Sequence, residues 1–282
     1  MRRVALGLLL AVFIAGGGSA YLGWSDTAHY LGQQMLQVRL NYAAAIAFRI
    51  DRLAARIRMG KDQYALAMFM KERADQTDPL PEGFRWLRDE YNNQAIDLFE
   101  AYTSADNLKV SESRASAGLL IWLNNPFQPS PRAERLLRES IELERQKNPD
   151  DPADQLKEPW RYYLLAHFLL IRGKETEDQA ALKEAILWNE TLLRNMRNGK
   201  TLDPMWLEQC GDINAALQRW QIAEACYKES IVVWSRQPLD NGNLVRAKLV
   251  PILRILNKTA EADAMQTHLD NQPKPEPPFG FR

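Results

Sequence analysis

Residues 202–238 constrain the fold more than any other stretch, because two apolar-periodic segments lie there on either side of a short turn. Pro204 stands where a first helix would begin, with Asp203 as its N-terminal cap. A second series of apolar or small residues follows the turn at 219–221. The two series are Leu207, Cys210, Gly211 and Asn214, then Ala223, Tyr227, Ser230 and Ile231. The pattern predicts a helix–turn–helix hairpin that ends before Pro238.

These residues resemble the tetratricopeptide repeat. The pattern of that repeat, Trp-x2-Leu-Gly-x2-Tyr…Ala-x3-Phe…Pro, is matched in outline by Leu207-x2-Cys210-Gly211-x2-Asn214…Ala223-x3-Tyr227…Pro238. The front of the pattern recurs as Trp160-x2-Tyr163-Leu164-x2-His167, and the lengthened turn expected at 172–178 resembles the Sel1-like variant of these repeats. A further echo lies near the start of the chain, where Gly32 and Ala44 have the same separation as Gly211 and Ala223.

The resemblance implies an all-α fold of antiparallel helix hairpins stacked as a solenoid. It also implies a concave surface, lined by the first helices of the hairpins, that holds a peptide or protein partner. The residues expected on that surface are Arg161, Phe168, Glu208, Asp212 and Ala215. A non-repetitive helical bundle is the alternative fold.

Apolar periodicity and proline breaks predict helices along the rest of the chain. Residues 26–60 read as a hairpin or as one long helix, and Ser130 is the expected cap of a helix that starts at Pro131. Further helices are expected over 62–76, 81–103, 111–123, 131–147 and 259–269. The expected domains are an anchor or signal peptide at 1–25, a membrane-proximal helical region at 26–148, a linker at 149–159, repeats at 160–270 and a proline-rich tail at 271–282.

The amino-terminal segment is the strongest indication of location. Arg2 and Arg3 precede an uncharged run that is long enough to cross a bilayer as a helix, residues 4–25. The charge asymmetry predicts a single-pass protein of the bacterial inner membrane, with its amino terminus in the cytoplasm and residues 26–282 in the periplasm. The alternative is a signal peptide cleaved after Gly18-Ser19-Ala20, which would leave a soluble periplasmic protein.

Composition and motifs argue for binding rather than chemistry. Lys plus Arg equal Asp plus Glu at 36 each, so no excess positive charge favours a nucleic-acid partner. The sequence contains no HExxH, GxSxG, P-loop, GxGxxG or four-cysteine pattern. The three histidines, His29, His167 and His268, are far apart in the sequence. We therefore expect no catalytic residues, no metal, no cofactor and no small-molecule substrate.

The two cysteines lie on opposing helices of the predicted 202–238 hairpin, at nearly equal distances from its turn. Antiparallel packing would bring Cys210 and Cys226 side by side. In an oxidising compartment they would form a disulfide, and otherwise they would be two buried free thiols.

Three functions are compatible with the sequence. The first is a membrane-tethered scaffold that binds protein partners and supports assembly of a cell-envelope complex. The second is an accessory subunit held in a larger complex through its membrane helix, with Gly16-Gly17-Gly18 as the close-packing surface. The third is an all-α enzyme acting on cell-wall glycan, which would need a general acid with a raised pKa in a cleft.

Overall fold

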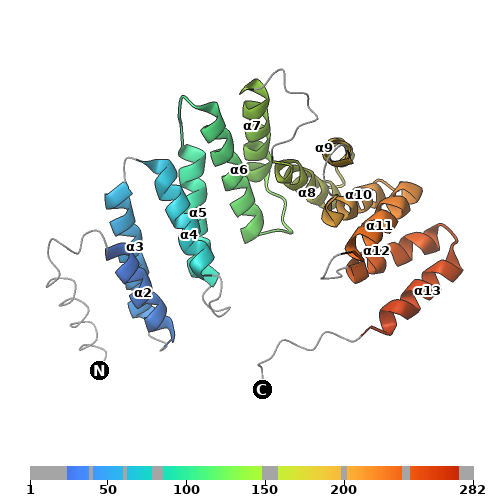
Figure 1. The fold of residues 1–282 in the computed structure, drawn as a ribbon, viewed down its shortest axis with the longest axis horizontal. Helices are drawn as coiled ribbons and strands as arrows, with labels where there is room; N and C mark the ends of the chain where they lie inside the picture. Colours follow the sequence, from blue (N-terminus) through green and yellow to red (C-terminus); the bar gives the residue numbers. More distant parts are fainter. Residues whose placement is uncertain are drawn as a thin grey trace. The chain divides into compact units, whose positions relative to one another are not determined.

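The computed structural model describes residues 24–37, 41–59, 62–77, 85–147, 158–197, 202–236 and 242–272. Within these ranges every regular element is an α-helix, which confirms the predicted all-α class (Figure 1). The helices are α2 (Trp24–Gln37), α3 (Asn41–Met59), α4 (Gln63–Thr77), α5 (Arg85–Ala101), α6 (Asn107–Asn124), α7 (Pro131–Lys147), α8 (Trp160–Glu175), α9 (Gln179–Arg197), α10 (Pro204–Ala216), α11 (Trp220–Trp234), α12 (Gly242–Ile255) and α13 (Thr259–Asp270).

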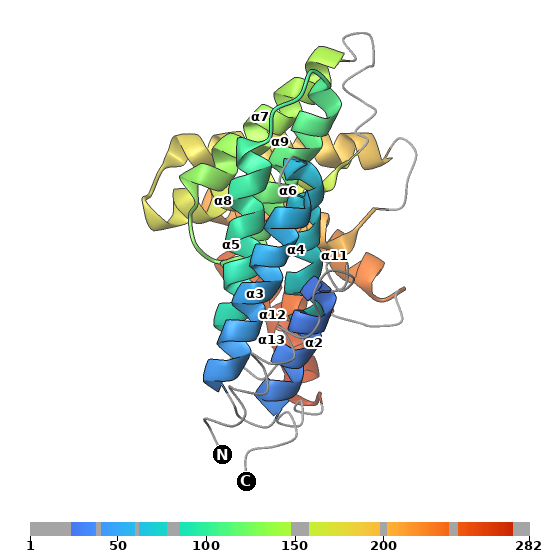
Figure 2. The ribbon, with the colours of Figure 1, turned by 90° about the vertical axis from the view of Figure 1, so that its left-hand side faces the viewer.

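The chain divides into two compact units between Ala105 and Asp106. In each unit consecutive helices pack as hairpins, and α4 and α5 lie side by side in both ribbon views (Figures 1 and 2). In the second unit the hairpins also pack on one another, through α7 with α8, α9 with α10 and α11 with α12. This packing of neighbouring hairpins is consistent with the predicted helical-repeat solenoid.

The domain boundaries stay a prediction, although the packing bears on them. The α6–α7 hairpin lies in the second unit and contacts α8, so contacts span the two sides of the expected linker at 149–159. Residues 149–157 of that linker and residues 273–282 of the tail lie outside the described ranges.

A glycine on the first helix of two hairpins lets the second helix approach closely. A Cβ atom on Gly211 would lie 2.3 Å from the Tyr227 ring, and one on Gly32 would lie 2.7 Å from the Phe48 ring. Gly32 and Phe48 have the same separation along the chain as Gly211 and Tyr227. The repeat-like pattern near residue 32 therefore corresponds to the same packing of two helices. The stretch 26–60 therefore forms two helices, α2 and α3, rather than one long helix.

Local capping signals place several helix ends where the sequence predicts them. The Asp203 carboxylate accepts a hydrogen bond from the Met205 backbone N–H at 2.8 Å, and Ser130 Oγ accepts one from Ala133 at 3.2 Å. Two expectations were wrong. Helix α6 begins at Asn107 rather than near 111, because Asp106 caps it. The turn between α8 and α9 is short rather than lengthened, because α8 continues to Glu175 and Asp178 caps α9.

A buried carboxylate joins the four helices that the structure describes in the first unit. Asp51 on α3 accepts a hydrogen bond from the Tyr91 hydroxyl of α5 at 2.5 Å. His29 Nδ1 of α2 and Arg73 Nε of α4 each lie 3.5 Å from the same carboxylate oxygen. Burial and the Asp51 charge both raise the pKa of Tyr91, so its hydroxyl stays a donor. Of these four side chains, only Arg73 also lines the hollow beside α4, whereas Asp51, Tyr91 and His29 do not, so we assign the cluster a structural role.

The membrane-anchor prediction falls almost entirely outside the part of the chain that the structure describes, since residues 1–23 are not described. Among the described helices, none combines the length and apolarity needed to span a bilayer.

Replacing Gly211 with alanine tests the close approach of α10 and α11. Alanine is the better helix former by about 1 kcal/mol, so the variant would be more stable if the space beside Gly211 were open. Because the methyl group would overlap the Tyr227 ring, we expect a loss of about 1–3 kcal/mol in the free energy of unfolding. Urea unfolding of both proteins measures this difference, and a more stable variant would show that the helices do not meet there.

Candidate functional site

A groove of 410 Å³ in the second unit is the candidate site. Its walls come from the first helix of each hairpin, α6, α8, α10 and α12, and from the loop after α6. The lining residues are Trp122, Pro126, Phe127, Tyr163, His167, Leu170, Ile171, Lys174, Met205, Glu208, Gln209, Asp212 and Lys248. The lining therefore combines an aromatic wall, made by Trp122, Phe127, Tyr163 and His167, with a few apolar side chains and with charged groups.

The aromatic wall is organised around His167. Its ring stacks on Tyr163 with centroids 6.0 Å apart and meets the edge of Trp122 at 6.2 Å. His167 Nε2 lies 2.7 Å from the Pro126 carbonyl oxygen, which can only accept, so this nitrogen carries the proton. The hydrogen bond fixes the loop after α6 against α8. That loop presents Phe127, whose side chain is 81% exposed at the edge of the groove.

The charged groups form a compact ion cluster. Lys248 Nζ of α12 lies 2.7 Å from both Glu208 and Asp212 of α10. Burial acts to lower the pKa of Lys248, but the two carboxylates outweigh it and raise the pKa above its ordinary value. Asp212 also accepts a hydrogen bond from the Tyr227 hydroxyl at 2.7 Å. Both signs of charge are therefore held at fixed positions beside the aromatic wall.

The backbone of the groove is held by buried amides. Gln209 Nε2 of α10 donates to the Tyr163 carbonyl of α8 at 2.9 Å, and its oxygen accepts from Asn189 of α9 at 3.0 Å. Asn189 donates to the Trp206 carbonyl as well, at 3.1 Å. These hydrogen bonds fix α8 and α10 relative to each other, so the spacing of the two walls is set by packing rather than by a ligand.

Two of the five predicted groove residues line this groove, and three do not. Glu208 and Asp212 face it together. Ala215 is half-buried and packs instead against the core cluster that includes Tyr227 and Val245. Phe168 is completely buried in the core of the second unit, so it cannot contact a partner.

Arg161, the fifth predicted groove residue, is 1% exposed and joins three helices. Its guanidinium donates to Ser111 Oγ of α6 at 2.7 Å and to Glu144 of α7 at 3.1 Å, and it pairs with Glu158 at 2.5 Å. Two carboxylates and a hydroxyl satisfy the buried charge. Arg161 therefore holds the α6–α7 hairpin against α8 and does not bind a partner.

Sequence reasoning missed most of the groove. Lys248 lies 36 residues beyond Asp212, and only the packing of α12 against the α10–α11 hairpin brings them together. Trp122 lies in the predicted 111–123 helix, where its apolar ring is expected to be buried by packing, yet the ring borders the groove. Phe127 carried a usable signal, because it is an aromatic residue between two prolines in a short loop, where it has no helix face to occupy.

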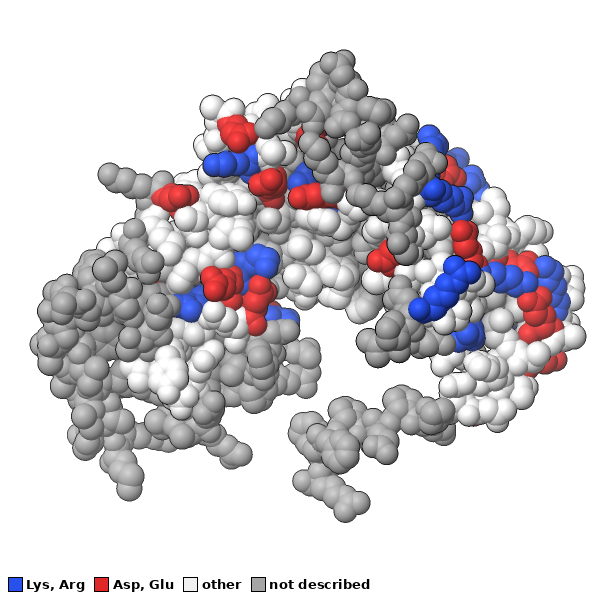
Figure 3. All heavy atoms as spheres, viewed as in Figure 1, with Lys and Arg blue, Asp and Glu red and all other residues white. Residues whose placement is uncertain are grey.

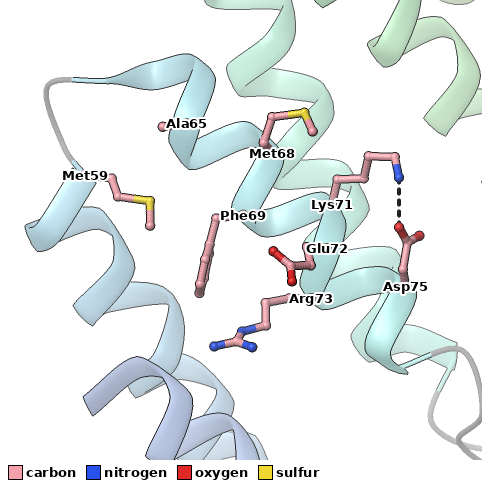
Figure 4. A pocket seen from close by; sticks show the side chains of 8 residues that line it. All are labelled: Met59, Ala65, Met68, Phe69, Lys71, Glu72, Arg73 and Asp75. Atoms are coloured by element: carbon pink, nitrogen blue, oxygen red, sulfur yellow. Dashed lines mark hydrogen bonds and ion pairs between the residues drawn. The ribbon is translucent and has the colours of Figure 1, made fainter. Parts of the chain in front are cut away.

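The first unit has a wider hollow of 670 Å³ that is a poorer site. All of its lining residues except Met59 come from α4, so a single helix face borders most of it. Figure 4 shows Phe69 and Arg73 on the side of α4 toward α3, while Lys71 pairs with Asp75 away from them at 2.8 Å. The Arg73 guanidinium lies 4.6 Å from the centre of the Phe69 ring. The charges of this hollow are thus engaged with their own neighbours.

One buried glutamate has a raised pKa, which is the feature that a glycan-cleaving enzyme would need. Burial raises the pKa of Glu134 on α7, against the opposing effect of Arg172 at 2.7 Å and Arg138 at 3.9 Å. However, Glu134 borders neither of the two hollows described above. Its contact with Arg172 joins α7 to α8, so we assign it to the packing of hairpins. Among the described residues, no group of His, Cys, Asp and Glu side chains has the arrangement of a metal site.

The two cysteines lie together behind the groove. The structure records a disulfide between Cys210 of α10 and Cys226 of α11, with Cα atoms 5.9 Å apart. The two cysteines form a small buried apolar cluster with Leu193 and Leu207. The bond would join the two helices whose neighbouring residues, Asp212 and Tyr227, are hydrogen-bonded at the charged end of the groove.

No family model matches the chain, and no curated protein matches it.

Alkylation and intact-mass measurement test the state of the cysteines. Denatured protein alkylated without reductant should carry no label, and it should carry two after reduction. Reduction should also cost about 3 kcal/mol of unfolding free energy, the value expected for a loop of this length. Two labels without reductant would show that Cys210 and Cys226 are free thiols in the purified protein.

A pH series tests the buried imidazole. Burial lowers the pKa of His167 below its ordinary value, so the unfolded chain takes up the proton first as pH falls. The stability that the neutral ring contributes is present above about pH 6.5 and is lost as pH falls below it. Relative to His167→Gln, the wild-type protein should therefore lose more unfolding free energy between pH 7.5 and pH 5.5. If the wild-type protein and His167→Gln lost equal unfolding free energy over this range, the His167 ring would be in a solvated environment.

Proposed function

We propose that this protein is a membrane-tethered, exported helical-repeat scaffold that binds a protein partner in the groove of its second unit and supports the assembly of a cell-envelope complex. The observation that carries the proposal is the placement of the groove on the first helix of successive hairpins, with Phe127 exposed at its edge. The partial tetratricopeptide pattern supports it, since the first helices of such repeats line the ligand surface.

The lining suits an extended peptide better than a small molecule. Phe127 and Met205, which is 41% exposed, offer apolar contact at separate points of the groove. Lys174 lies exposed at the edge, and the Lys248 cluster supplies both charge signs to a peptide backbone or side chain. Aromatic residues of this kind commonly contribute most of the binding free energy of a protein interface.

The distribution of charge supports a protein partner rather than a nucleic acid. Figure 3 shows Lys and Arg next to Asp and Glu on the visible face, without a broad region of one sign. A phosphate backbone would need a continuous positive surface. Attachment to the bacterial inner membrane through residues 4–25, with the helical units in the periplasm, rests on the sequence pattern of that segment.

The accessory-subunit function differs in the surface that it uses. In that case Gly16-Gly17-Gly18 would hold the complex together and the groove would be dispensable.

Affinity purification from the native membrane in mild detergent separates the two functions. We expect Phe127→Ala with Met205→Ala to reduce recovery of the partner about tenfold, because the two changes remove apolar contact without opening a core cavity. The matched control is Leu187→Ala, a side chain of α9 that is 62% exposed and lies outside the groove lining. It should leave recovery unchanged.

Two outcomes would contradict the groove proposal. If the double variant recovers the partner as the wild type does, while leucine at positions 16–18 abolishes recovery, the membrane segment is the binding surface. If the wild-type protein is recovered alone and monomeric, neither function holds.

A further inference from the structure

The aromatic wall of the groove matches one class of peptide particularly well. Trp122, Phe127 and Tyr163 border the groove with flat apolar rings, and His167 stacks among them. Proline-rich segments adopt an extended polyproline II helix whose pyrrolidine rings pack against such surfaces. Little conformational entropy is lost on binding, because the segment is already extended.

Polar groups of the groove also suit this ligand. A polyproline II segment leaves its backbone carbonyls without internal partners. Within the described residues, the structure records no acceptor for the Trp122 indole N–H. Tryptophan N–H can only donate, so a carbonyl oxygen supplied by a ligand would satisfy it after a small shift of the ring.

The chain itself contains such a segment. Residues 273–282, PKPEPPFGFR, carry four prolines, and two phenylalanines follow them. Lys274 and Glu276 give the segment both charge signs, which complements the Glu208 and Asp212 carboxylates and the exposed Lys174. The segment begins directly after Gln272, two residues beyond the end of α13.

Residues 273–282 are long enough to reach the groove from the end of α13. At the polyproline II rise of 3.1 Å per residue, ten residues span about 31 Å. Helix α13 packs on α12, whose Lys248 borders the groove. Packed helix axes lie about 8–10 Å apart, and the six residues from Gly242 to Lys248 cover about 9 Å along the helix. Both displacements together bring the segment to the Lys248 edge of the groove, and the rest of its length can extend from there toward the aromatic wall.

We propose that residues 273–282 occupy the groove of their own chain and compete with the protein partner. The proposal rests on the groove being the partner-binding site, as proposed above. A tethered segment has an effective concentration in the millimolar range, so even a weak contact would keep the groove filled until a stronger ligand displaces it. The segment would thus restrict binding to partners of sufficient affinity.

A labelled synthetic peptide covering residues 271–282 tests the proposal by fluorescence anisotropy. Two proteins are compared in mild detergent, the full chain and a chain that ends at Gln272. The shortened chain should bind the peptide saturably, and the full chain should bind it at least about tenfold more weakly, because its own segment competes. A peptide with alanine at all four proline positions, which keeps the charges and both phenylalanines, should bind the shortened chain about tenfold more weakly.

Variants of the shortened chain locate the binding site. Phe127→Ala and Met205→Ala should each weaken peptide binding, whereas Leu187→Ala should not. Absence of saturable binding to the shortened chain, equal binding to both chains, or indifference to Phe127→Ala would each overturn the proposal. Dimerisation of the full chain that depends on residues 273–282, measured by light scattering, would overturn occupancy within one chain.

The two proposals can fail separately. If the peptide does not bind but Phe127→Ala with Met205→Ala still reduces partner recovery, the competing segment is wrong and the scaffold function stands. If both experiments are insensitive to Phe127, the groove is not a binding site.

Discussion

The close contact between a glycine and an aromatic ring is the constraint on which the α2–α3 and α10–α11 hairpins depend. Gly211 lies against Tyr227 and Gly32 lies against Phe48, at the same separation along the chain in two separate units. Only hydrogen at these positions lets the second helix come so near, and the ring then fills the space beside it. The same approach in the α10–α11 hairpin brings Cys210 and Cys226 together and positions the Tyr227 hydroxyl on Asp212.

Polar contacts, more than apolar ones alone, set how successive hairpins meet in the second unit. Arg161 joins α8 to α6 and α7, Gln209 joins α10 to α8, and Lys248 joins α12 to α10. Such contacts are directional, so they fix the register of neighbouring helices where an apolar face would tolerate sliding. The groove is a consequence of this register, because the helices that carry its aromatic wall and its ion cluster belong to different hairpins.

Some local signals, such as the caps of α7 and α10, were read correctly from the sequence, whereas the cap of α6 was missed and the groove was predicted only in part. Asp203 with Pro204, and Ser130 with Pro131, act within one turn, so helix starts could be predicted from them. Arg161 and Phe168 were assigned to the groove, but their burial depends on Glu144, Ser111 and a core from other hairpins. Glu208 and Asp212 were found because they lie one turn apart on the first helix of a predicted hairpin, whereas the position of Lys248 depends on the packing of the next hairpin. The sequence indicates which face of a helix a charged residue occupies, but it does not indicate which distant residue it pairs with.

The claim that the groove binds a protein partner is tested most directly by site-specific crosslinking in intact cells. A photoreactive phenylalanine analogue placed at position 127 should form one discrete crosslinked product, while the same analogue at position 187 should not. Removal of residues 273–282 serves as the second comparison. It should increase the yield of the crosslink at position 127, because the segment proposed to compete with the partner is then absent. A crosslink of equal yield at both positions, or none at position 127, would contradict a partner-binding role for the groove.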